Sequence, residues 1–280
     1  LENMTKAMEG CDIVYHTAAT AYEGLSVFSP VLVTRNIFEA SVTTITAAIR
    51  NKVKRIVYCS SMARYGHHDK MPYKEDYECR PQDPYGIAKK AGEDVLRNLC
   101  ETHGVEYVIA VPHNIVGPRQ KYDDPFRNVM SIMLNRMLQG KQPIIYGDGK
   151  QQRCFSYIDD CLYCLNALAF QDNVIGEVIN IGPDEEPITI NELAEACANE
   201  TGINLDPIHH KDRPKEVKLA VCSSDKARDL LGYSTATNMR QSVKKTAEYI
   251  RTRGTKKFQY HLPLEIINDK TPETWKNKLI

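Results

Sequence analysis

A tyrosine and a lysine stand four positions apart in the segment Tyr85-Gly-Ile-Ala-Lys89. On a helix this spacing places both side chains on one face, where the phenol and the ammonium group can act on each other. A nearby ammonium group stabilises a phenolate, so the tyrosine could take a proton from a hydroxyl group near neutral pH. Loss of that proton lets the carbinol carbon give up hydride to a nicotinamide ring. The same spacing is common in solvated surface pairs, so the pair alone leaves both interpretations open.

Two serines, Ser60 and Ser61, end a strand-like run at residues 55–59. The carboxyl ends of parallel strands form the edge where α/β proteins place catalytic groups, and a hydroxyl there could hydrogen-bond a reacting oxygen. Serine at a strand end is by itself more often a cap or turn residue. A chemical role for Ser61 is therefore predicted only together with Tyr85 and Lys89.

Apolar strand-like runs alternate with amphipathic helical stretches, which is the pattern of a parallel sheet with helices on both faces. Gly104 is placed to end the helix that carries Tyr85 and Lys89. Thr189 precedes a further helix, in which Glu192 occupies the first turn. We expect strands at 12–16, 55–59, 107–111, 144–146 and 178–181, and other helices at 33–51, 85–103, 128–138, 161–170, 225–231 and 239–251.

The composition excludes several classes of protein. The chain of 280 residues has 36 Lys and Arg against 36 Asp and Glu, so no net basic field attracts nucleic acid or an anionic membrane. Nine scattered cysteines favour a reducing, cytoplasmic location. Cys161 and Cys164 have Cys-x-x-Cys spacing without a second ligand pair nearby, so we predict no metal site. Neither a membrane span nor a signal peptide is predicted, and we expect a soluble protein.

Three motifs that could carry this chemistry follow one another along the chain. They are Gly10-x-Asp12-x-Val14-x-His16-x-Ala18-Ala19, then Ser60-Ser61 with Tyr65-Gly66, then Pro84-Tyr85-x-x-x-Lys89. With this ordered signature the chain resembles the extended short-chain dehydrogenase/reductases. The resemblance implies a Rossmann-type doubly wound parallel sheet of the α/β class, NAD as cofactor, Ser61 as the catalytic hydroxyl, Tyr85 as the base and Lys89 as its partner. The cofactor-binding positions that it implies are His16, Ala18, Ala19, Ser60, Tyr85, Lys89 and Pro112.

Later segments narrow the likeness to the nucleotide-sugar branch of that family, such as UDP-glucose 4-epimerase. These segments are 113–120, 145–155 and 213–217. The resemblance implies that asparagine and arginine positions contact the diphosphate, that Tyr146 packs on the base and that Glu216 meets the ribose. A guanidinium fork suits phosphate oxygens, although each arginine could also be a structural ion-pair former. The substrate-binding positions implied are Ser61, Asn114, Asn128, Tyr146, Arg153, Arg213 and Glu216.

The resemblance also implies how the chain is divided. We expect a truncated NAD-binding domain over residues 1–112 and a smaller nucleotide-sugar domain over 113–254, interleaved with returning segments near 152–170. An extension over 255–280 holds the only tryptophan, Trp275, and we assign that extension no chemical role. A homodimer through the helices at 33–51 and 85–103 is expected, although their amphipathic faces could equally pack on their own sheet.

One part of the family pattern is not present. Members open with a glycine-rich turn that binds pyrophosphate at a helix N-terminus, and no such spacing occurs among the 15 glycines here. Our hypothesis is that the sequence is a fragment or a partial gene product, which would leave one edge of the sheet unpaired. The residues that choose between NAD and NADP belong to that part.

Met62 and Ala63 disfavour two other activities of the family. Related 4,6-dehydratases carry an Asp-Glu pair at these positions, and 3,5-epimerases carry a cysteine where Ala63 stands. What remains is removal and return of hydride, so we predict epimerisation of a nucleoside diphosphate hexose at carbon 4 through a keto sugar. Ala220 is a candidate for the residue that gates pocket size. A nucleotide-sugar reductase that releases NAD(P)H and a degenerate sugar-nucleotide-binding protein stay open as alternatives.

Overall fold

The computed structural model describes residues 1–214 and 217–280. Its main sheet has four parallel strands in the order β1-β2-β3-β8. In the register, Ile13 of β1 lies opposite Arg55 of β2, and Arg55 lies opposite Glu106 of β3. Within the described residues β1 is an edge strand that pairs only with β2. The strands are β1 (Ile13–His16), β2 (Arg55–Cys59), β3 (Glu106–Pro112) and β8 (Val178–Ile181).

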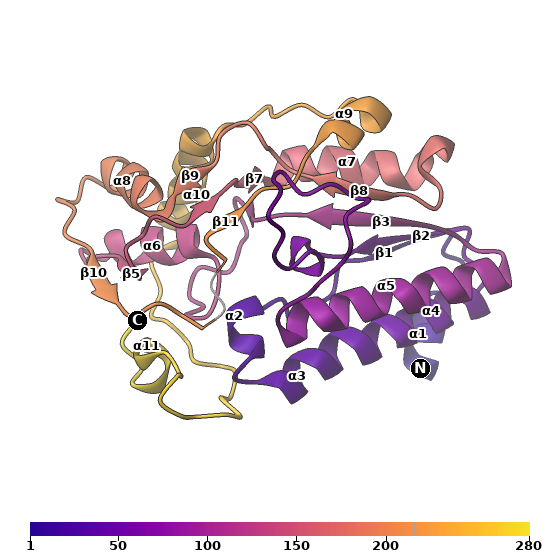
Figure 1. The fold of residues 1–280 in the computed structure, drawn as a ribbon, viewed down its shortest axis with the longest axis horizontal. Helices are drawn as coiled ribbons and strands as arrows, with labels where there is room; N and C mark the ends of the chain where they lie inside the picture. The colour runs from indigo at the N-terminus through magenta and orange to yellow at the C-terminus, as the bar shows by residue number, and fades with distance from the viewer. Residues whose placement is uncertain (215–216) are drawn as a thin grey trace.

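Both faces of this sheet are covered by helices, which explains why β2 is buried at every position. Alternate side chains of a strand point to opposite faces. Ile56 and Tyr58 accordingly pack in one cluster, with α4 and α5, whereas Val57 and Cys59 pack in another, with α7 and α9. Figure 1 shows the sheet between these two helix layers. The layers contain α4 (Ala40–Arg50) and α5 (Pro84–His103) on one face, and α7 (Ile158–Phe170) and α9 (Asp225–Leu231) on the other. The predicted α/β class and Rossmann-type sheet are confirmed.

The helix that carries Tyr85 and Lys89 begins and ends where local sequence signals predict. The Asp83 carboxylate accepts a hydrogen bond from the Gly86 amide at 2.8 Å, and Pro84 occupies the first helical turn. Gly104 ends the helix in a left-handed conformation, with φ of 68°. The predicted helix at 85–103 is therefore confirmed to within one residue.

The predicted single helix at 33–51 is wrong in detail. It consists of α3 (Pro30–Thr34), the π-helical turn η1 (Arg35–Glu39) and α4. Its buried positions Val33, Ile37, Ser41 and Ile45 recur every four residues. An α-helix has 3.6 residues per turn, so such a row would drift around its axis, and the wider π turn keeps the row on one face.

A second group of elements packs around its own apolar cluster and stands beside the main sheet in Figure 1. Three helices contact one another in it, namely α6 (Val129–Met137), α8 (Ile190–Thr201) and α10 (Met239–Arg253). Thr189 and Glu192 form a reciprocal cap at the start of α8, as predicted. The short strands pair as β5 (Ile144–Tyr146) with β10 (Ile208–His210), β6 (Gln152–Arg153) with β9 (Ile188–Thr189) and β11 (Leu219–Ala220), and β4 (Ile115–Val116) with β7 (Ser156–Tyr157). The division at residues 112 and 254 stays a prediction.

The remaining elements are short. They are α1 (Glu2–Ala7), α2 (Glu23–Ser26), η2 (Met62–Arg64), η3 (Asp172–Val174) and α11 (Glu273–Lys276). The last of these belongs to residues 255–280, which we call the tail and which Figure 1 draws in yellow near α2. Among the described helices, none combines the length and the apolar character that crossing a bilayer requires.

Candidate active site

A cavity of about 590 Å³ opens at the carboxyl ends of the main strands. Residues that follow β1, β2 and β3 line it, which is the edge where parallel α/β sheets bind their ligands. Ser61, Tyr85 and Lys89 all line this one cavity. The structure therefore brings together the three residues that the sequence marked as a possible catalytic set.

Close packing at Gly86 brings Ser61 and Tyr85 together. The Ser61 hydroxyl accepts a hydrogen bond from the Ala63 amide at 3.2 Å and so caps η2. A Cβ atom at Gly86 would lie 2.7 Å from the Ala63 carbonyl oxygen, closer than such atoms can approach. Only glycine at this position lets the start of α5 press against η2.

The pKa of Tyr85 is controlled by burial. Its side chain is buried, and burial raises the pKa to about 12, although a hydrogen bond with the Ser61 side chain lowers it. The Arg127 cation also lowers this pKa, whereas the Glu23 carboxylate raises it. The sequence predicted a lowered pKa through Lys89, and that prediction is wrong in sign because loss of solvation outweighs the nearby positive groups.

Lys89 is 2% exposed and contacts the sheet edge. Its Nζ atom donates a hydrogen bond to the Cys59 carbonyl at 2.8 Å and lies 5.5 Å from the centre of the Tyr58 ring. Burial lowers its pKa to about 8, while Cys59 and Glu93 oppose the shift. An ammonium group has three donors. Within the described chain only the Cys59 carbonyl accepts from Nζ, so donors are left for a ligand.

A buried ion pair supports the floor of the cavity. Glu93 is fully buried, and Arg64 lies 2.9 Å from it with 4% of its side chain exposed. The Ser60 hydroxyl donates a short hydrogen bond to the same carboxylate. Burial raises the pKa of Glu93, while the Arg64 cation and the Ser60 hydroxyl lower it. Because Glu93 is one helical turn beyond Lys89, this pair ties α5 to the end of β2.

The residues at this end of the cavity fit a nicotinamide cofactor. Its ribose needs hydrogen-bond donors beside the sheet edge, and the spare donors of Lys89 meet that need. Of the predicted cofactor-binding positions, Ala19, Ser60, Tyr85, Lys89 and Pro112 line the cavity. Two do not line it. His16 is buried with Nε2 3.0 Å from the Ser41 hydroxyl, and Ala18 is exposed.

Six of the seven predicted substrate-binding positions line the same cavity. The Arg213 guanidinium lies 4.9 Å from the centre of the Tyr146 ring, and the Asn114 side chain donates to the Cys154 carbonyl at 2.8 Å. Glu216 lies outside the described residues. The candidate size gate Ala220 also lines the cavity. The predicted positions found there are Ser61, Asn114, Asn128, Tyr146, Arg153 and Arg213.

Sequence reasoning missed much of the cavity lining, including three residues whose chemistry bears on the site. Arg127 adds a cation, whose guanidinium stands 5.5 Å from the centre of the Tyr22 ring. Trp275 and Ile280 come from the tail, to which no chemical role was assigned. The position of Trp275 as the only tryptophan was visible in the sequence, but no local pattern connects it to Tyr85 or Arg213.

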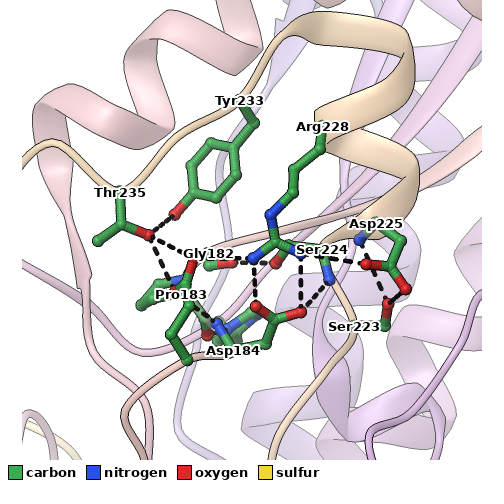
Figure 2. A network of polar contacts seen from close by, with 11 residues as sticks. Gly182, Pro183, Asp184, Ser223, Ser224, Asp225, Arg228, Tyr233 and Thr235 are labelled. Carbon is green, nitrogen blue, oxygen red and sulfur yellow. Dashed lines mark hydrogen bonds and ion pairs between the residues drawn. The ribbon is translucent and has the colours of Figure 1, made fainter.

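The turn after β8 contacts His113, one of the residues that line the cavity. Figure 2 shows Arg228 of α9 reaching this turn, where its two terminal nitrogens bind both oxygens of Asp184. The same guanidinium donates to Glu185 at 2.8 Å. Next to Asp184, the Pro183 carbonyl lies 3.0 Å from Nε2 of His113, a cavity residue. Arg228 therefore fixes the turn on which His113 rests.

We expect Arg228→Leu to lower the free energy of unfolding by about 1–2 kcal/mol, because a bidentate pair is lost although Arg228 is partly exposed. Urea denaturation measures this change. The matched control is Arg35→Leu, which removes an exposed ion pair with Glu39 and should cost less than about 0.5 kcal/mol. Equal effects of the two substitutions would show that the Asp184 contact adds nothing to stability.

Comparison with known proteins gives consistent results. A model of the NAD dependent epimerase/dehydratase family matches residues 1–182. The crystal structure of UDP-glucose 4-epimerase from Thermotoga maritima with UDP-glucose superposes with a TM-score of 0.85 at 28% identity, covering 90% of this chain and 82% of that one. UDP-glucuronic acid 4-epimerase from Bacillus cereus, in complex with UDP-glucuronic acid and NAD, gives 0.82 at 28% identity, with 90% and 79% covered. GDP-mannose 3,5-epimerase of Arabidopsis thaliana is 29% identical over 266 residues, or 90% of this chain and 68% of that protein.

Proposed function

Because the chain belongs to the NAD dependent epimerase/dehydratase family, we propose that it is an NAD-dependent nucleotide-sugar epimerase that inverts carbon 4 of a nucleoside diphosphate hexose. The observation that carries this proposal is that Ser61, Tyr85 and Lys89 line one cavity. Three arginines line the same cavity, namely Arg127, Arg153 and Arg213. The relatives with 4-epimerase names support carbon 4. The 3,5-epimerase relative is the reason that the position of inversion needs an experiment.

In the proposed reaction, Tyr85 takes the proton of the sugar hydroxyl and Ser61 hydrogen-bonds the same oxygen. NAD, when bound, supplies the acceptor and later the donor of the hydride. Ala19, Ser60 and Pro112 would hold this cofactor together with Lys89. Lys89, with a pKa near 8, stays mostly charged at neutral pH and keeps a positive group beside the developing phenolate. Tyr85 then returns the proton when the keto sugar is reduced.

The three arginines suit the diphosphate end of the substrate. The Arg213 guanidinium lies against the Tyr146 ring, and the planar fork of an arginine matches the geometry of phosphate oxygens. We expect Arg153 and Asn114 to contact the same diphosphate and Tyr146 to lie against the base. Inversion requires the keto sugar to rotate while the diphosphate stays bound. We therefore expect strong contacts with the diphosphate and weak contacts with the sugar.

The first alternative is another enzyme of the family, a nucleotide-sugar reductase or dehydrogenase. The second alternative is a protein of a different class, which binds a sugar nucleotide without catalysis. A reductase changes NADH absorbance in proportion to product, whereas an epimerase leaves it constant because the cofactor is regenerated. The test incubates the purified protein with NAD and a panel of nucleotide sugars and follows the sugar protons by NMR. Appearance of the carbon-4 epimer supports the proposal. Net NADH formation, inversion at another carbon, or no reaction with any sugar that binds contradicts it.

We further propose a homodimer in a reducing compartment. Val31, Phe38 and Ile87 are exposed on α3, η1 and α5, the helices at which a second copy is expected to pack. The nine cysteines are free, including Cys59 beside the cavity, which is the state expected in a reducing compartment. Sedimentation velocity tests the dimer, because Ile87→Asp would place a charge in the proposed contact and shift the protein to monomer.

A further inference from the structure

The tail connects parts of the chain on the two sides of the cavity. On α6, the Asn135 side chain exchanges two hydrogen bonds with the Lys256 backbone, at 2.9 and 3.0 Å. At the other end, the Glu265 carboxylate accepts from the amides of Val31 and Leu32, both at 2.9 Å, and so caps α3. The tail therefore crosses from the helices of the second group to those of the main sheet, as the yellow trace in Figure 1 shows.

Trp275 is the largest side chain that the tail buries against these elements. It is 2% exposed and meets the ring of Phe126 at a centroid distance of 5.5 Å and that of Phe28 at 6.1 Å, edge to face in both cases. Its neighbour Thr274 shares a short hydrogen bond with the hydroxyl of Tyr146. The indole is thus held rigidly from both sides of the cavity.

The indole also lies next to the proposed diphosphate site. A point at the Cβ position of Gly24 is 3.5 Å from Cη2 of Trp275 and 3.5 Å from Nη1 of Arg213. Gly24 follows Glu23, whose carboxylate influences the pKa of Tyr85. Trp275 and Arg213 therefore both border Gly24, and both line the cavity that also contains Tyr85. The indole nitrogen of Trp275 is buried without a hydrogen-bond partner in the described part of the chain, so an acceptor on a ligand could satisfy it.

From these contacts we propose that the tail is part of the substrate site and that Trp275 positions the nucleotide sugar at the junction of its hexose and diphosphate. A rigid indole wall restricts where the sugar ring can lie, and apolar walls with a few polar groups are typical of ligand cavities. The inference rests on the proposed function, because it adds a residue to that same site. It is specific to this part of the chain, which lies beyond the family match at residues 1–182.

Trp275 is the only tryptophan of the chain, so its fluorescence reports directly on this wall. We expect UDP-glucose, added to the holoenzyme, to change the emission with a saturable dependence that matches the Kd from calorimetry. UDP alone should give a smaller change, because it lacks the hexose. Emission that stays constant while calorimetry records binding of UDP-glucose would overturn the proposal.

A substitution gives the second readout. Trp275→Phe should raise the Kd and KM for UDP-glucose about tenfold, the effect of removing one apolar group from a pocket, with kcat changed less than about threefold. The matched control in the same tail is Ile267→Ala, an exposed residue outside the cavity, which should leave Kd and KM unchanged. If Trp275→Phe lowers the melting temperature, Ile280→Ala shortens a second side chain of the same wall and leaves the ring contacts of Trp275 with Phe28 and Phe126 in place.

The outcomes separate this inference from the proposed function. If Trp275→Phe and Ile280→Ala both keep the wild-type Kd and KM, the proposed role of the tail in substrate binding is rejected. The proposal of epimerisation is not affected by that result. Weaker binding of UDP-glucose in both variants, in a protein that turns over no nucleotide sugar, would support the wall and reject epimerisation.

Discussion

Replacing Tyr85 by phenylalanine is expected to lower kcat about a thousandfold, the usual contribution of a positioned proton acceptor. The phenol is the only group in the proposed reaction that moves the proton of the sugar hydroxyl. Phenylalanine keeps the ring that packs against Val33, Ile37 and Ala88, so the fold and the cavity should survive. The Kd for the nucleotide sugar should therefore stay within about threefold of wild type, since loss of one hydroxyl contact has a small net effect. Single-turnover kinetics and calorimetry measure the two quantities.

The control for this substitution is Tyr163→Phe, which removes a hydroxyl that donates to the Leu231 carbonyl on α9, outside the cavity. It should leave kcat unchanged. Turnover retained in Tyr85→Phe at more than about a tenth of the wild-type rate would remove Tyr85 from the role of base, because general-base losses are at least about a hundredfold.

Burial also predicts the direction of the pH profile. The pKa of Tyr85 is raised to about 12, so the phenolate fraction in the protein rises with pH throughout the accessible range. The positive charge of Lys89, by contrast, is lost as the pH passes about 8. We therefore expect kcat to rise with pH below about 8 and to level off or fall above it. A profile that falls steadily from neutral pH upward would contradict both assignments.

The local sequence predicted the elements of the fold because their signals are local. Asp83, Pro84 and Gly104 mark the two ends of α5 through backbone requirements that involve only neighbouring residues. Apolar runs marked the strands, and amphipathic stretches marked the covering helices, in the same way. The residues placed in the cavity by motif, such as Tyr85 and Arg213, followed from their order along the chain.

What the sequence did not predict depends on distant contacts. Trp275 reaches the cavity through rings and hydrogen bonds contributed by α2, β5 and the segment near Phe126, and no periodicity in the tail encodes them. The contact of Lys89 with the Cys59 carbonyl likewise depends on how deeply α5 packs against β2. For that reason the sequence predicted an ammonium that lowers the pKa of Tyr85, whereas the structure shows two buried groups whose pKa values are both set by loss of solvation.

Replacing Lys89 by methionine should remove activity and yet stabilise the protein at neutral pH. Activity should fall at least about a hundredfold, because the positive group proposed to stabilise the phenolate is lost. The difference between the usual pKa of 10.5 and about 8 corresponds to roughly 3 kcal/mol of instability while the group is charged in both folded and unfolded states. Methionine leaves the Cys59 carbonyl without its partner, which costs roughly 1–3 kcal/mol, so the net gain is about 1 kcal/mol.

The pH dependence of this gain identifies its cause. The folded protein releases the Lys89 proton near pH 8 and the unfolded chain near 10.5, so wild-type stability relative to Lys89→Met rises across that window. Above it the cost of the charge is gone, the hydrogen bond to Cys59 remains, and the wild type should be the more stable protein. Lys90→Met, next to it on α5 but paired with Asp94 at the surface, should show no such reversal. Urea denaturation of the three proteins across this pH range measures the difference in stability. If the effect of Lys89→Met does not change with pH, burial does not destabilise the charged form of Lys89.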